Sequence, residues 1–213
     1  MNSAIRWRII TLQAVMVVVL AAGAIFAFSL GTFTTNQIKD ELTSQQIFFP
    51  GKDQIKAGGA LDPAEFSQEI RDQAGNQVTD GNQARIYAND FIGKHLAGIA
   101  NGLTYASMGD KINAVKAQQA ALAKDDPNYT TLGTQITTLN AQRDTLFKGE
   151  TLRGNLLNAY GWWTVGSYTT FASYGLMLVA LAVLGALVFE VVAARRPEKV
   201  LVVHKAKAIS TPA

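Results

Sequence analysis

The chain has 213 residues, of which 48% are hydrophobic, and 19 basic side chains outnumber 16 acidic ones to give a net charge of +3. The excess lies near the two ends, because residues 31–166 carry 12 basic and 14 acidic side chains. This distribution excludes the clustered basic face that nucleic-acid binding needs, and the lack of cysteine excludes disulfides and thiolate metal sites.

The first apolar segment, residues 9–30, is predicted to be a transmembrane helix after a short N-terminus of residues 1–8. A signal peptide has a shorter apolar region, about 7–15 residues, before a cleavage site of small residues. Residues 22–24 resemble such a site, but the length of the segment favours a retained anchor. Arg6 and Arg8 place the N-terminus in the cytoplasm under the positive-inside rule, and Trp7 belongs to the expected membrane interface.

Residues 31–166 are expected to form an extracytoplasmic helical domain. Residues 34–46 extend the first helix, which Pro50 and Gly51 end because proline and glycine interrupt helices. Asp62 and Pro63 are typical of a helix start, with aspartate as the N-cap and proline at the first position. This second helix is predicted to end near residue 72.

Residues 84–99 have the spacing of an amphipathic helix, with Tyr87 and His95 on its apolar face. A lone histidine on such a face is most often a buried side chain with satisfied hydrogen bonds, so His95 is interpreted as structural. The alternative is a ligand or proton site, in which this helix and the segment GLTYA (residues 102–106) form the wall of a pocket. The contact residues of that pocket are Tyr87, Asp90, His95 and Tyr105.

The most regular pattern lies in residues 105–147, where two seven-residue repeats predict an antiparallel helical hairpin with a coiled-coil contact. The first repeat comprises Met108, Ile112, Val115, Gln119 and Leu122, and the second comprises Leu132, Ile136, Leu139, Arg143 and Leu146. A turn at Pro127 is expected to bring Gln119 near Ile136 and Arg143 near Ile112. The second arm is expected to continue towards the final apolar segment.

Glu150 and Arg153 are predicted to form a surface ion pair, with a lipid-headgroup or partner contact as the alternative. The second transmembrane helix is predicted over residues 167–194, preceded by interfacial aromatic side chains and followed by a basic cytoplasmic tail of residues 195–213. The interfacial residues are Tyr160, Trp162, Trp163, Tyr168, Arg195 and Arg196. Glu190 is expected to reach the interface or to pair with Arg6 or Arg8.

Small residues recur in both apolar segments: Gly23, Ala27 and Gly31 in the first, and Ala182, Gly185 and Ala186 in the second. Such rows allow helices to approach closely in lipid. One interpretation is that the two spans contact each other or a partner through these rows. The alternative is that glycine and alanine are simply common in membrane spans.

Several segments resemble a family of actinobacterial membrane proteins: AGGALDPAEF, IYANDFIGKHL, GLTYA and, above all, LFKGETLRGNLLNAYGWWTVG. The resemblance covers residues 9–196 and implies two spans around an exterior helical domain, with residues 111–147 as a variable part. No activity is established for this family. Its label is often aromatic ring-opening dioxygenase, but such enzymes bind iron with two histidines and a carboxylate. The two histidines, His95 and His204, lie on opposite sides of the membrane in the predicted topology, so the label is rejected.

The sequence therefore predicts a mainly α-helical protein of the plasma membrane with both termini in the cytoplasm. The favoured hypothesis is a non-enzymatic structural or interaction protein of the cell envelope. It would have no cofactor or metal, and it would assemble with itself or with another membrane protein. The alternative hypothesis is an extracytoplasmic ligand-binding or sensing module.

Overall fold

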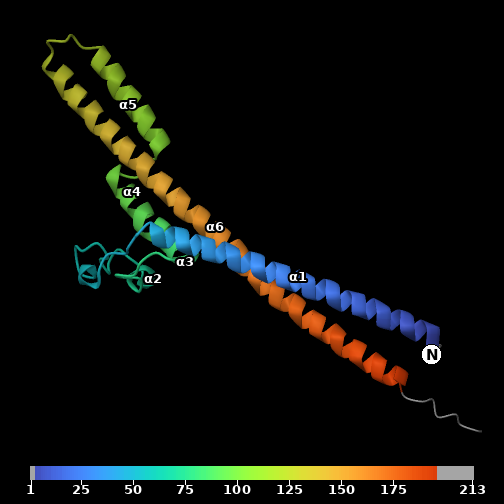
Figure 1. Cartoon of the computed structure of the whole chain (residues 1–213). Helices are drawn as coiled ribbons and strands as arrows, with labels where there is room; N and C mark the ends of the chain where they lie inside the picture. The colour runs from blue at the N-terminus through green and yellow to red at the C-terminus, as the bar shows by residue number, and fades with distance from the viewer. Residues whose placement is uncertain (1–2, 196–213) are drawn as a thin grey trace, which may run out of the picture. The chain divides into compact units, whose positions relative to one another are not determined.

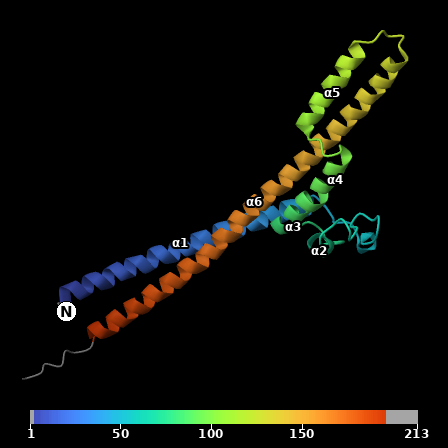
Figure 2. The same cartoon turned by 180° about the vertical axis from the view of Figure 1, so that it is seen from behind.

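The structure is a computed structural model that describes residues 3–195, and this part of the chain is mainly helical without a β-strand. Residue contacts divide the chain into two compact units. The first unit comprises residues 1–27 with 172–213, and the second comprises residues 28–171. The two longest helices, α1 (Ser3–Ser44) and α6 (Pro127–Arg195), contribute to both units (Figures 1 and 2). The mainly α-helical prediction is confirmed.

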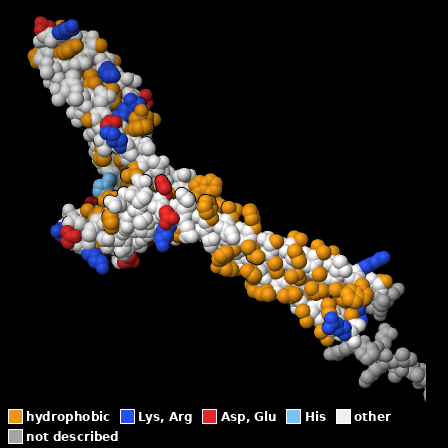
Figure 3. Space-filling view, viewed as in Figure 1, with side chains coloured by type: hydrophobic (Ala, Val, Ile, Leu, Met, Phe, Trp, Pro, Cys, Tyr) orange, Lys and Arg blue, Asp and Glu red, His pale blue; other side chains and the backbone are white. Residues whose placement is uncertain are grey.

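Both long helices contain a section that is long and apolar enough to cross a membrane. Only 11% of that section is buried in α1 and only 6% in α6. The hydrophobic side chains of these sections therefore form a broad exposed surface, which Figure 3 shows. A core helix of a soluble protein would instead bury one apolar stripe against its neighbours, so the low buried fraction is consistent with a membrane location.

In the first unit, the buried residues of the apolar sections are Ile10 and Ala24 in α1 and Ser173 and Ala180 in α6. They are separated by multiples of seven residues, and half-buried Val17 and Leu187 continue the two rows. A seven-residue repeat is the spacing at which two helices keep one face towards each other. The predicted rows of small residues contribute less to this contact, because Ala182, Gly185 and Ala186 are exposed and a Cβ added at Gly23 would meet no atom within 4 Å. These four residues therefore do not form a contact between α1 and α6, whereas Gly31 of the predicted row does.

Within the second unit, α1 and α6 come together at two glycines. A Cβ added at Gly31 would lie 2.6 Å from the carbonyl oxygen of Gly166 and 2.7 Å from the amide nitrogen of Thr170. A Cβ added at Gly166 would lie 3.0 Å from the methyl group of Thr35. Only glycine allows the two backbones to approach this closely.

The rest of the second unit surrounds a small hydrophobic core. Leu61, Ile70 and Val78 are fully buried, although they come from a segment with little regular structure. This segment contains the 3₁₀ turn η1 (Lys52–Gln54) and the short helix α2 (Gln68–Arg71). The helix predicted from Asp62 is wrong in extent. The Asp62 carboxylate instead accepts hydrogen bonds from the amides of Gly58 at 2.7 Å and Ala64 at 2.8 Å, and so closes a turn.

The predicted helix over residues 84–99 is present, but it is not regular. It begins as α3 (Gly81–Ile86), widens into the π-helical turn η2 (Tyr87–Ile92) and continues as α4 (Gly93–Ile99). A π turn contains one more residue than an α turn. Burial consequently recurs every four residues, at Ala84, Ala88, Ile92, Leu96 and Ala100. The prediction that His95 is buried is wrong, because the π turn places Leu96 in the core and leaves His95 exposed.

The helix α5 (Tyr105–Ala120) lies beside the first part of α6 in both views of the chain (Figures 1 and 2). All ten positions of the two predicted repeats are buried or half-buried. The observed neighbours differ from the predicted ones by one to two helical turns. The Gln119 side chain donates to the carbonyl oxygen of Tyr129 at 2.9 Å, and the Arg143 guanidinium lies against Gly109 and Tyr105. Gln119, late in α5, thus lies beside a residue early in α6, and Tyr105, at the start of α5, lies beside a later residue of α6, as expected for helices that run in opposite directions.

Candidate functional site

A cleft of about 230 Å³ opens on the surface of α5 and α6. It is lined by Tyr105, Asn140, Arg143, Asp144 and Phe147. The start of α5 fixes one side of the cleft, because the Thr104 and Ser107 side chains each accept a hydrogen bond from the other residue's amide. This reciprocal capping is a strong helix-start arrangement, and it places Tyr105 at the first helical position.

The guanidinium group of Arg143 is the central polar group of this cleft. Its Cζ atom lies 4.3 Å from the centroid of the Tyr105 ring, which is a cation–π contact. The Tyr105 and Phe147 rings lie 5.7 Å apart, and the two residues remain 40% and 54% exposed. The Nε atom of Arg143 is buried without a hydrogen-bond partner. Among residues 3–195, no acceptor or carboxylate pairs with this guanidinium.

A second cluster consists of aromatic side chains along η2 and α4. The rings of Tyr87 and Phe91 lie 5.0 Å apart, and those of Phe91 and His95 lie 4.4 Å apart. His95 bonds through Nδ1 to the Phe91 carbonyl oxygen at 2.8 Å. Burial raises the pKa of the Tyr87 hydroxyl above its ordinary value. The row therefore stabilises the widened turn by aromatic stacking.

His95 also borders a shallow cavity of about 340 Å³, which is lined in part by Asp62, Glu65 and Lys94. The charged groups there already have partners. Two amides bind the Asp62 carboxylate and lower its pKa. Lys94 lies 4.5 Å above the Phe66 ring and 3.7 Å from the Glu65 carboxylate. Each of these charged groups thus already has a partner within the chain.

Arg153 joins α6 to the π turn. Its Nη1 atom donates to Glu150 at 3.3 Å, as the sequence predicts, and its Nη2 atom donates to the Asn89 side chain at 3.1 Å. The neighbouring Asp90 is half-buried, and desolvation raises the pKa of its carboxyl group. Nearby Glu69 raises that pKa further, while Arg85 lowers it. The structure thus assigns Glu150 and Arg153 a contact within the chain.

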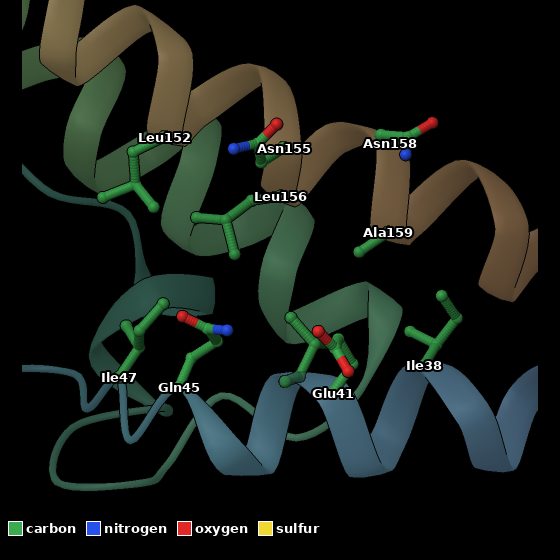
Figure 4. A pocket seen from close by; sticks show the side chains of 10 residues that line it. Ile38, Glu41, Gln45, Ile47, Leu152, Asn155, Leu156, Asn158 and Ala159 are labelled. Carbon is green, nitrogen blue, oxygen red and sulfur yellow. The ribbon is translucent and has the colours of Figure 1, made fainter.

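A groove of about 330 Å³ separates the end of α1 from α6 within the second unit. Figure 4 shows Ile38 and Glu41 on α1 facing Leu156 and Ala159 on α6. Apolar side chains line most of the groove, and Glu41, Gln45, Asn155 and Asn158 supply its polar groups. This groove was not predicted, because its two walls are more than 100 residues apart in the sequence.

The predicted interfacial side chains fall into two groups. Trp7, Trp162, Tyr168 and Arg195 are exposed. Tyr160 and Trp163 are half-buried, and the indole of Trp163 packs directly on the backbone of Gly81. Trp163 is therefore in part a packing residue of the second unit. Arg196 and His204 lie outside the described residues.

Arg6 and Glu190 lie together in the first unit, with Arg6 Nε 3.7 Å from Glu190 Oε2. The predicted pairing of Glu190 with Arg6 is confirmed. Arg6 also donates to the carbonyl oxygen of Ala193 at 3.3 Å. Within residues 3–195, no group of three or more His, Asp and Glu side chains has an arrangement that could hold a metal ion.

The most informative residue that the sequence did not predict as a site residue is Arg143. The sequence did contain a signal for this residue, because Arg143 is the charged member of a repeat whose other positions are apolar. A comparison of the chain with protein-family models, with curated proteins and with solved structures finds no match. The fold and the candidate sites define a mainly helical protein with two helices apolar and long enough to cross a membrane.

Proposed function

We propose that this protein is a two-span plasma-membrane protein whose extracytoplasmic helices act as a non-enzymatic interaction subunit of the cell envelope. The observation that carries the proposal is the unequal burial along α5 and α6. The repeat positions Met108, Ile112, Leu139 and Leu146 are buried, whereas Leu122, Leu132 and Ile136 near the connecting turn are only half-buried. Two helices alone leave this part of the apolar contact open, and a third helix from a neighbouring molecule would cover it.

The membrane location is supported by the side chains around the apolar sections. Large hydrophobic residues on all sides are exposed, among them Leu12, Val18, Phe26, Leu178 and Phe189. Such exposure is unfavourable in water and favourable in lipid. Arg6, Arg8 and Arg195 lie at one end of the two helices, and the positive-inside rule assigns that end to the cytoplasm. Residues 31–166 then lie outside.

The alternative function, binding of a small polar ligand, is supported by the cavity beside His95. The interaction proposal is preferred because Lys94 of that cavity pairs with Glu65 and Asp62 accepts from backbone amides, whereas the Arg143 guanidinium has no acceptor among residues 3–195. The actinobacterial membrane proteins that the sequence resembles have the same two-span layout, and the resemblance implies no ligand.

The proposal is tested by replacing residues 111–147 with a short flexible linker. We expect both spans to remain inserted and the remaining domain to stay folded, while oligomerisation or partner binding, measured in mild detergent, is lost. Light scattering after gel filtration measures the mass of the complex, and circular dichroism checks the helices. Mass spectrometry of co-purifying proteins identifies a different partner, if one is present. An unchanged assembly would show that the contacts lie in the spans.

A further inference from the structure

The Arg143 guanidinium in the cleft has no hydrogen-bond acceptor among residues 3–195. A guanidinium carries five N–H donors and remains charged in proteins. Here its Nε atom is shielded from water without an acceptor, and the stacked Tyr105 ring fixes the position of the group. A buried donor without a partner is unfavourable, and more so when it is charged. The two Nη groups are not buried, so a carboxylate placed in the cleft would pair with them and supply the acceptor that the guanidinium lacks.

The surroundings of the guanidinium have the composition of a protein–protein contact. Arginine and tyrosine are enriched among the residues that dominate binding energy at interfaces, and exposed aromatic rings supply apolar area around them. Tyr105 and Phe147 form such an aromatic pair, half exposed at the mouth of the cleft. The cleft therefore suits a protein partner that carries a carboxylate.

Asp144 in the same cleft is a suitable carboxylate, when it comes from a second copy. In its own chain it pairs with Lys148 at 2.6 Å, but both side chains are largely exposed. An exposed pair four residues apart on a helix contributes little to stability. Exchange of this pair for a partly buried contact with Arg143 would therefore be favourable.

We propose that the cleft is the contact between two copies of this chain, in which Arg143 of each copy binds Asp144 of the other. This inference rests on the proposed function, because it uses the membrane to fix the relative orientation of the copies. Two copies inserted in the same direction are related by a twofold axis along the membrane normal. Residues with equal numbers then lie at equal heights, and adjacent residues of a helix differ by only about 1.5 Å.

Charge exchange tests this contact in the full-length protein. Arg143→Glu alone places two carboxylates opposite each other at each contact, and Asp144→Lys alone places two cations there. We expect each variant to lose self-association at least about 10-fold, because like charges at an interface are unfavourable by more than 1.4 kcal/mol. A mixture of the two variants restores both attractive contacts. Differently tagged copies, co-expressed and isolated in mild detergent, measure the mixed complex.

The matched control exchanges Lys116 and Asp110, which are exposed on α5 away from the cleft lining. Lys116→Glu and Asp110→Lys should leave self-association unchanged, alone or mixed. Self-association of Arg143→Glu at the wild-type level would overturn the inference. Loss in both cleft variants without restoration in the mixture would also overturn it, because Arg143 would then bind a carboxylate or phosphate of another molecule.

A second measurement covers the case in which Arg143→Glu fails to fold. The chain has no cysteine, so a single introduced thiol is a unique probe. Phe147→Cys should give a disulfide-linked dimer when membranes are oxidised with copper phenanthroline, whereas Lys116→Cys should not. Equal linking at both positions would contradict the contact. If removal of residues 111–147 abolishes assembly but these tests fail, the proposed function stands and the Arg143 contact is wrong.

Discussion

Asp90 lies where its protonated form is favoured, since desolvation and then Glu69 raise its pKa above the ordinary value of 3.8. The unfolded chain therefore loses this proton at a lower pH than the folded chain. As the pH rises through the interval between the two pKa values, this group lowers the free energy of unfolding. The stability lost in this interval is not regained at higher pH.

We predict that Asp90→Asn raises the midpoint of thermal unfolding at pH 7. The amide cannot ionise, so the penalty for a half-buried carboxylate disappears. The gain should decrease as the pH falls through the interval between the two pKa values and should be lost below 3.8, where the carboxyl group binds a proton in both states. Unfolding of the detergent-solubilised protein across this pH range measures the effect. Asp110→Asn, at an exposed position of α5, is the control, and an equal gain there would contradict the explanation.

The residues that the sequence placed wrongly share a physical cause. The apolar character of residues 84–99 was evident, but the choice between His95 and Leu96 as the buried residue depends on one extra residue in η2. Tyr87, Asn89 and Phe91 do not encode a π turn by propensity. Contacts from other elements stabilise it, including the hydrogen bond from Arg153 to Asn89. Such contacts cannot be read from local spacing.

At the scale of elements, the repeats of α5 and α6 were the most predictable feature. Each repeat identified the residues that the helices bury, because apolar residues at alternating spacings of four and three lie on one helix face. The register was not predictable to the same degree. The Arg143–Tyr105 stack and the hydrogen bond from Gln119 to Tyr129 fix it, and both depend on the length of the connecting turn.

The contact between Gly31 and Gly166 leads to a prediction with a matched control. Gly31→Ala adds a methyl group 2.6 Å from the Gly166 carbonyl oxygen, so the backbones of α1 and α6 must move apart. We expect a loss of about 1–3 kcal/mol, the usual effect of overpacking. Thermal unfolding in detergent provides the measurement.

Gly23→Ala is the control, because a Cβ there meets no atom within 4 Å. Both substitutions gain the same helix propensity, about 1 kcal/mol. Gly23→Ala should therefore be neutral or slightly stabilising. If both variants unfold at the same temperature, the close glycine contact does not contribute to stability.

At the scale of the whole molecule, the charge at the ends of the two long helices leads to a prediction of topology. Reporter domains fused at position 125 should be active only outside the cytoplasm, and those fused at position 213 only inside it. Position 125 lies in the turn between α5 and α6, where an insertion disturbs no helix. A cytoplasmic signal at 125 would place residues 31–166 inside and would remove the basis of the proposed function.

The π turn described above also affects how the chain tolerates changes in length. Loss of one residue from an α-helix rotates every later side chain by about 100° and is normally disruptive. In the segment Tyr87–Ile92, the same loss would convert the wide turn into an ordinary one. The buried residues Leu96 and Ala100 would keep their places in the core. A version of this chain one residue shorter in this segment is therefore compatible with the same fold.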